Sequence, residues 1–149
     1  MIETIMTEAK SFEAEADKAN AKLNVAGKLS SLWIFVLINM LFRDMHEFAR
    51  VGFLEGILEA NANGTQASDG LLLTAGIVLE LAIIMIIVPR FLTIKIARWA
   101  NIVVGLIFIA TTIGFNLQPD LDDLFFAAME MIGLISIIVI AWRWNHEPE

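Results

Sequence analysis

The stretch that decides the fold is LLLTAGIVLELAIIMIIV at residues 71–88, in which Glu80 is the one charged side chain. The hydrocarbon core of a bilayer is roughly 30 Å thick, so a helix needs about 20 predominantly apolar residues to cross it. Residues 29–48, 97–117 and 121–142 are apolar stretches of similar length. We therefore predict an all-α, polytopic membrane protein with four transmembrane helices in an antiparallel bundle.

The composition argues against several classes of protein. Hydrophobic residues make up 58% of the 149-residue chain, which is high for a water-soluble domain. The four spans fill one domain at residues 28–149 and leave no room for a separate catalytic domain. The chain has no cysteine, two histidines outside any metal-binding motif and a net charge of −7. We expect no metal, no cofactor and no nucleic acid, because no basic patch could follow a phosphate backbone.

Residues 1–27 are predicted to form a cytoplasmic amphipathic helix. Apolar residues recur there at helical spacing, with Glu and Lys between them; they are Ile2, Ile5, Met6, Ala9, Phe12, Ala16 and Ala19. Two interpretations are open. The helix either rests in solvent on the membrane or on the bundle, or it binds a dedicated partner.

The loop charges predict the orientation in the membrane. Basic residues precede the first span, fill the link between the second and third spans and follow the fourth; they are Lys18, Lys22, Lys28, Arg90, Lys95, Arg98 and Arg143. The other two links are acidic. Because basic loops stay on the cytoplasmic side, we expect a multi-pass protein of the cell membrane with both termini cytoplasmic.

Tryptophan positions predict the same orientation. Trp33, Trp99, Trp142 and Trp144 all fall at the ends of the spans that the charges place in the cytoplasm. Indole rings favour the headgroup boundary of a bilayer. The sequence therefore predicts an aromatic belt at the cytoplasmic boundary.

Charged residues within the hydrophobic stretches, namely Arg43, Glu80 and Glu130, define the candidate site. Such groups usually face a bundle interior, a partner charge or a water-filled cavity. At 1.5 Å of rise per residue, Arg43 and Glu130 lie about 10 Å, and Glu80 and Asn39 about 16 Å, below the outer boundary. This predicts two polar layers, Arg43 against Glu130 and Asn39 near Glu80. One guanidinium cannot compensate both carboxylates, which favours a ligand or proton site.

Two further features bear on this site. Small and hydrogen-bonding residues recur along the third span at Asn101, Gly105, Phe108, Thr112 and Asn116, a pattern that suits a close helix–helix seam. Thr112 is the member of that pattern assigned to the site, although ordinary packing without a ligand would explain the whole stripe. His46 lies three residues from Arg43 and is either a proton relay or an interfacial histidine in water.

Three motifs carry a family resemblance. They are Lys28-Leu29-Ser30-Ser31-Leu32-Trp33-Ile34-Phe35, Leu79-Glu80-Leu81 and Arg98-Trp99-Ala100-Asn101-Ile102. Together they resemble a family of small four-helix bacterial membrane proteins classed only as a domain of unknown function. The resemblance covers residues 28–143. It implies a bacterial inner-membrane protein, and it brings no substrate, cofactor or catalytic residue with it.

Three functions follow from these patterns. The first is binding or transport of a small molecule or proton through a buried polar site in the outer half of the bilayer. The second is a non-catalytic accessory or structural subunit, whose charges only specify helix register. The third, a membrane enzyme with Glu80 or Glu130 as acid and His46 as base, has no nucleophile, metal signature or cofactor loop to support it. Lipid, a small-molecule ligand and further copies of the chain are the expected partners.

Overall fold

The computed structural model describes residues 1–62, 69–115 and 121–144, and this part of the chain contains five helices and no strand. The helices are α1 (Ile2–Ala49), α2 (Phe53–Ala62), α3 (Asp69–Phe91), α4 (Ile94–Phe115) and α5 (Leu121–Arg143). Four of them, α1, α3, α4 and α5, are long and apolar enough to cross a membrane. The predicted all-α class and the four long apolar helices are confirmed.

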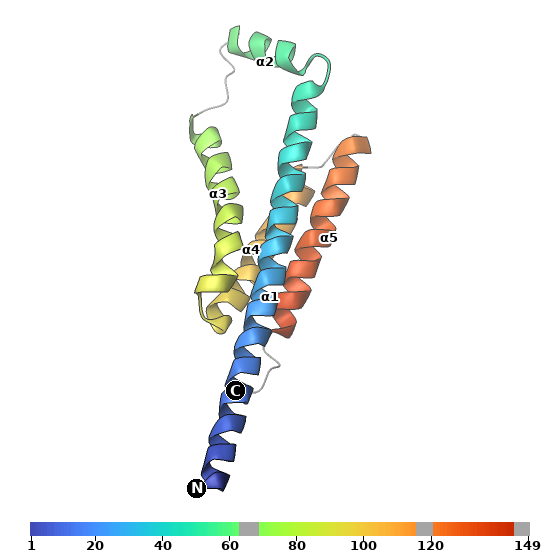
Figure 1. Ribbon diagram of the computed structural model, residues 1–149. Helices are drawn as coiled ribbons and strands as arrows, with labels where there is room; N and C mark the ends of the chain where they lie inside the picture. Colours follow the sequence, from blue (N-terminus) through green and yellow to red (C-terminus); the bar gives the residue numbers. More distant parts are fainter. Residues whose placement is uncertain (63–68, 116–120, 145–149) are drawn as a thin grey trace.

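α1 is one uninterrupted helix of 48 residues that includes both the predicted amphipathic segment and the first span. No break separates residues 1–27 from the span, because the junction contains no proline and its one glycine, Gly27, is tolerated within a helix. At 1.5 Å per residue the helix is about 72 Å long. Residues 1–20 are all exposed, and this part of α1 projects from the rest of the molecule as a free rod (Figure 1).

The turn after α1 depends on a glycine. Gly52 has φ +87°, a left-handed conformation that side chains other than hydrogen disfavour. The Arg50 N–H donates to the Glu47 carbonyl at 3.1 Å, and the Gly56 N–H donates to the Gly52 carbonyl at 2.9 Å. The chain therefore leaves α1 and starts α2 within three residues. α2 then bridges the ends of α1 and α3 (Figure 1).

α3 continues three residues beyond the apolar stretch 71–88, through Pro89 to Phe91. The proline lies in the last turn, and the Leu92 N–H closes that turn by donating to the Val88 carbonyl at 3.1 Å. α4 then begins at Ile94 after a short turn. The basic link between these two helices is thus shorter than expected.

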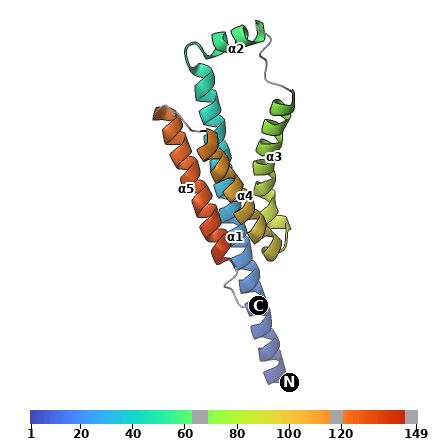
Figure 2. The same ribbon diagram turned by 180° about the vertical axis from the view of Figure 1, so that it is seen from behind.

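α1 lies at the centre of the arrangement. It packs against α3 and α5, α4 packs mainly against α5, and the contact between α3 and α4 is smaller. Both views show α3 leaning away from α1 toward the end at which α2 lies, hereafter the α2 end (Figures 1 and 2). Every side chain described between residues 72 and 77 of α3 is exposed. α3 is therefore packed tightly against the other helices only toward the end opposite α2.

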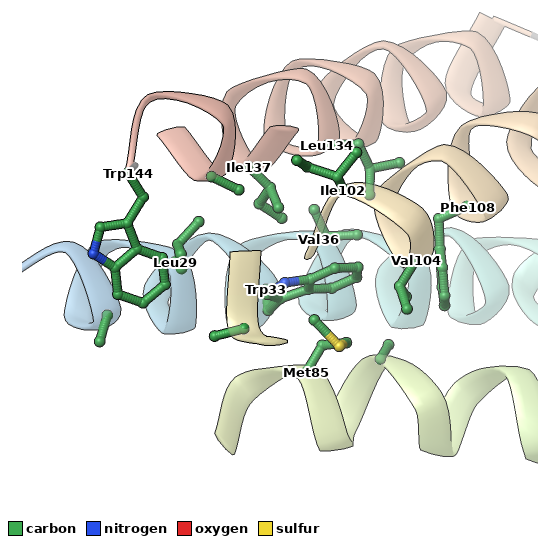
Figure 3. Packing of buried hydrophobic residues seen from close by; sticks show 14 residues of the cluster. Leu29, Trp33, Val36, Met85, Ile102, Val104, Phe108, Leu134, Ile137 and Trp144 are labelled. Carbon is green, nitrogen blue, oxygen red and sulfur yellow. The ribbon is translucent and has the colours of Figure 1, made fainter. Parts of the chain in front are cut away.

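The hydrophobic core is built around Trp33. Figure 3 shows side chains from all four long helices meeting there, and the Trp33 side chain is 0% exposed. Its ring meets Phe108 edge-on at 5.6 Å between centroids. Its Nε1–H donates to the Asn101 Oδ1 at 2.7 Å. Buried aromatic N–H groups usually find such a partner.

The core position of Trp33 corrects its assignment to an aromatic belt. Trp33 shares one face of α1 with the buried Leu29 and Val36, so the indole points inward although the residue lies near the end of its predicted span. Trp144 is also buried, whereas Trp99 and Trp142 are exposed. Sequence position gives the depth of a tryptophan but leaves its direction around the helix open.

Two glycines allow the close approach that the small-residue pattern predicts. A Cβ on Gly133 of α5 would lie 2.7 Å from Val36 Cγ2 of α1, and a Cβ on Gly105 of α4 would lie 3.0 Å from Ile138 Cγ1 of α5. Asn101, Gly105, Phe108 and Thr112 are all buried. The predicted seam along α4 is therefore confirmed over its described members; Asn116 lies outside the described residues.

Candidate functional site

An arginine–glutamate pair joins α1 to α5 on the α2 side of the core. The Arg43 Nη1 donates to the Glu130 Oε2 at 3.1 Å. The Glu130 side chain is 1% exposed and that of Arg43 is 20% exposed. This is the pairing that the depth arithmetic predicts. It places a carboxylate inside the protein and its counter-charge between that interior and the surface.

Thr112 brings α4 into the same site. Its hydroxyl Oγ1 donates to the Glu130 Oε2 at 3.4 Å, which is a long hydrogen bond. Thr112 is buried. Three helices therefore converge on one carboxylate oxygen, and three of the predicted site residues, Arg43, Glu130 and Thr112, are brought together.

The other carboxylate oxygen is left open. The Glu130 Oε1 is buried and has no hydrogen-bond partner within the described residues. Leaving a buried polar group unsatisfied costs about 1–3 kcal/mol, and more when the group is charged. A proton on the carboxyl or an external donor would relieve that cost. The described residues thus satisfy one oxygen of the Glu130 carboxylate and leave the other without a hydrogen bond.

Small residues on α5 explain how α1 comes close enough to form the pair. Ala127 and Gly133 lie three residues before and after Glu130, on the same face of the helix, and both are buried. The Val36 side chain packs directly against Gly133. Larger residues at these two positions would hold α1 away and leave Arg43 too far from the carboxylate.

The structure does not bring Asn39 and Glu80 together. The Asn39 Nδ2 donates to the Phe35 carbonyl in its own helix at 2.8 Å. Glu80 is exposed, and it makes no hydrogen bond or ion pair with any other described residue. It lies two residues from the buried Ala82, which is about 160° around the helix. The predicted second polar layer, Asn39 near Glu80, is therefore not formed by the described residues. Two residues at equal depth can still point in different directions, because depth does not fix the rotation of a helix about its axis.

His46 lies near the Arg43–Glu130 pair in sequence and faces elsewhere. Its side chain is 57% exposed, and its Nδ1 lies 4.0 Å from the Asp122 Oδ2. Its ring meets Phe126 edge-on at 5.2 Å. None of the described hydrogen bonds links His46 to Glu130. The geometry fits the interfacial alternative better than the proton relay.

An ionic cluster at the α2 end was not predicted from the sequence. Arg50, at the end of α1, lies 3.4 Å from a Glu47 oxygen, 3.3 Å from an Asp122 oxygen and 3.8 Å from an Asp123 oxygen. Partly exposed pairs of this kind contribute little each, and more as a network. The cluster fastens the ends of α1 and α5 above the buried pair. The excess of acidic residues in the flanking links was the one signal that could have indicated it.

A second polar group, at the opposite end of the core, was also missed. The Ser30 hydroxyl donates to the Ile86 carbonyl at 2.7 Å, and the Arg90 Nε donates to the Ser30 Oγ at 3.2 Å. The Ile86 carbonyl lies in the last turns of α3, one turn before Arg90. Ser30 and Arg90 thus tie this end of α3 to α1.

In the described part of the chain, no group of three or more His, Cys, Asp or Glu residues could hold a metal ion. Among known proteins, no curated protein and no solved structure matches the chain significantly, whereas a family model does. The match is to a family of unknown function, DUF6326, over residues 17–148. It includes the bundle and the Arg43–Glu130–Thr112 site and omits the tip of α1. The chain therefore belongs to DUF6326, a family of unknown function.

Proposed function

We propose that this protein is a multi-pass membrane protein, an antiparallel bundle of four spans, and that Glu130, Arg43 and Thr112 form a proton or small-ligand site in the outer half of the bilayer. The helix lengths and hydropathy support the membrane placement. So do the apolar side chains exposed along the outward faces, such as Ile84, Val103 and Ile135. In water these would form large exposed apolar patches, which monomeric soluble proteins rarely have.

Charge supports an orientation with the α2 end outside. The turn between α3 and α4 lies at the end opposite α2 (Figure 1), and Arg90, Lys95 and Arg98 flank it. The α2 end is acidic, with Glu55 and Glu59 on α2 itself. The excess of Lys and Arg marks the cytoplasmic side. Both termini and the free rod of α1 would then be cytoplasmic.

The unpartnered Glu130 Oε1 is the single observation on which the proposed site rests. A buried carboxyl with one oxygen saturated and the other open can accept a hydrogen bond from a ligand, or it can carry a proton itself. Arg43 stabilises the ionised form by its charge. Because the guanidinium is partly exposed while the carboxyl is enclosed, the pair connects the surface with the interior, as a site that loads and unloads must.

A structural role is the second candidate, and it too has a specific observation in its favour. The two bonds to the Glu130 Oε2 come from α1 and α4, while Glu130 itself belongs to α5. The carboxylate therefore fixes the relative register of three helices, which is the best-attested use of a buried polar group. In that case the protein would be an accessory or scaffold subunit with no ligand at this site.

Vesicle experiments separate the two roles. The purified protein is reconstituted into liposomes that contain a pH-sensitive dye, and a proton gradient is imposed. A proton site predicts that the gradient collapses faster with the parent than in empty vesicles or with Glu130→Gln. The control Glu55→Gln, which changes an exposed carboxyl on α2, should behave as the parent does. A folded Glu130→Gln protein that conducts as well as the parent would contradict the proton role.

Thermal stabilisation tests the ligand form of the proposal. Small amines and alcohols, which carry N–H or O–H donors, are screened for an increase in melting temperature, because a ligand that binds the folded state stabilises it. A ligand at this site should stabilise the parent and Glu55→Gln but not Glu130→Gln. If neither proton flux nor any such ligand depends on Glu130, the structural role stands.

A further inference from the structure

Glu80 lies at the middle of the outward face of α3. Its neighbours on that face, Ile77 and Ile84, are 60% and 48% exposed. The core face, with Ala82 and Met85, points in the opposite direction. Within the proposed membrane placement, on which this inference rests, Glu80 is about 16 Å from the outer boundary, near the middle of a hydrocarbon core roughly 30 Å thick.

A carboxyl in that position needs a polar partner. Acidic residues within spans almost always face a bundle interior or a water-filled cavity, because a lipid-facing charge costs several kcal/mol. Even a protonated carboxyl retains a donor and an acceptor that hydrocarbon cannot satisfy. Glu80 makes no hydrogen bond or ion pair within the described parts of the chain. Since none of the described residues serves as its partner, we look for that partner outside this chain.

The residues around Glu80 form a repeat suited to a facing helix. Leu73, Gly76, Glu80, Ile83 and Ile87 follow one another at steps of three, four, three and four residues. This is the heptad spacing of helices that pack side by side along a left-handed seam. Leu73 is 65% and Ile87 50% exposed. The repeat therefore marks a seam that the described residues leave exposed at Leu73 and Ile87.

Gly76 permits no close contact among the described residues, and a facing helix would make use of the space beside it. A Cβ on Gly76 would meet nothing within 4 Å, unlike one on Gly105 or Gly133. Small residues at such positions let two membrane helices approach closely. Gly76 lies one turn from Glu80 on the same face. A helix seated there would come close to the carboxyl.

We propose that the facing helix is α3 of a second copy, and that Glu80 pairs with the Glu80 of that copy across a two-fold axis normal to the membrane. Copies inserted in one bilayer have the same orientation, so a two-fold axis along its normal places each seam residue opposite its own equivalent. Only a self-complementary group suits that axis. A protonated carboxyl qualifies, because it donates one hydrogen bond and accepts another.

Disulfide trapping tests the seam directly. The chain has no cysteine, so single cysteines can be placed at Leu73 or Ile87 on the seam. Matched controls are Val103→Cys on α4 and Ile135→Cys on α5, each 50% exposed and apolar in the parent. Because a disulfide requires Cα atoms within about 7 Å, oxidation in native membranes should give covalent dimers at the two seam positions and monomers at the controls.

Variants of Glu80 test its place in the contact. Glu80→Gln keeps a donor and an acceptor, so trapping and dimer affinity should stay within about twofold of the parent. Glu80→Leu removes both, and since lipid supplies no hydrophobic drive between helices, dimer affinity measured by energy transfer between labelled copies should fall about tenfold. An apolar replacement that leaves affinity unchanged would contradict the pairing.

The remaining outcomes also decide the matter. Seam cysteines that stay monomeric in a folded protein, or that join only to a different protein, would overturn the second copy as occupant. Equal trapping at seam and control positions would show random collision and would overturn it as well. Fractionation of the membranes shows separately whether the chain is inserted. Loss of function in Glu130→Gln affects a different helix, so the Glu130 site and the α3 seam can fail independently.

Discussion

Removing Arg43 should destabilise this protein more than removing any exposed arginine. Arg43→Met keeps much of the length of the side chain and leaves the Glu130 carboxylate, which is 1% exposed, without its counter-charge. At an effective dielectric constant of about 20, two charges 3.1 Å apart attract each other by about 5 kcal/mol. Breaking one side of a buried pair typically costs about 3–5 kcal/mol. We expect a loss in this range at pH values where Glu130 stays ionised.

Protonation of Glu130 would limit that loss. A neutral carboxyl needs no counter-charge, so the destabilisation of Arg43→Met should be smaller at low pH than at high pH. The double variant Arg43→Met/Glu130→Met removes both charges, and it should recover most of the stability because well-packed apolar replacements of buried pairs are often neutral or better. The exposed Arg143, changed to Met, is the control.

Equilibrium unfolding in mixed detergent measures these differences. The free energy of unfolding is obtained at two pH values for the parent, for Arg43→Met, for Glu130→Met and for the double variant. The difference between the effects of the single and double changes gives the coupling between the two groups. An Arg43→Met protein as stable as the parent at both pH values, or a double variant no better than Arg43→Met, would refute the reasoning.

Five other substitutions test the packing and the topology. Gly133→Val forces a side chain into the contact with α1 and should cost about 1–3 kcal/mol of unfolding free energy. Gly114→Ala, where a Cβ meets nothing within 4 Å, should stabilise the protein slightly. Thermal melts of the two variants measure both effects. Asn101→Leu leaves a buried indole N–H unsatisfied and should cost about 1–3 kcal/mol, with a change in tryptophan fluorescence; unchanged emission and stability would contradict the bond. A cysteine at Glu59 should react with an impermeant thiol reagent on intact cells and one at Thr93 should not; the reverse pattern would reject the orientation.

Length, hydropathy and depth account for what could be predicted from the sequence. Four apolar stretches near 20 residues long predict four long helices, and these are found. The Arg43–Glu130 pair follows from depth because Arg43 is the one arginine or lysine in the outer half of the spans, and Glu130 is a carboxyl at the same depth on another span. The Asn101–Gly105–Phe108–Thr112 spacing indicates a packed face because small residues repeating every turn permit close contact.

Rotation about the helix axis could not be predicted, and it explains the main differences. Glu80 and Asn39 share a depth, but α3 turns Glu80 away from the core, since the face containing Met85 and Ala82 is the one buried. Trp33 points into the core for a similar reason. The continuity of α1 was hidden by the change of composition near residue 28, which alters the surroundings of the helix without interrupting its backbone. The Arg50 cluster depends on a contact between distant segments that no local pattern contains.

The most direct test of the Glu130 site is the protonation state of its carboxyl, read by difference infrared spectroscopy of the reconstituted protein. We predict a band of the protonated Glu130 carboxyl that appears and disappears reversibly with pH. This band should be lost in Glu130→Gln and should remain in Glu80→Gln. Small donors that bind the site should shift the same band. A Glu130 carboxyl that keeps one protonation state at every pH at which the protein stays folded, and that no added donor perturbs, would contradict the account and leave the pair as a structural fastening.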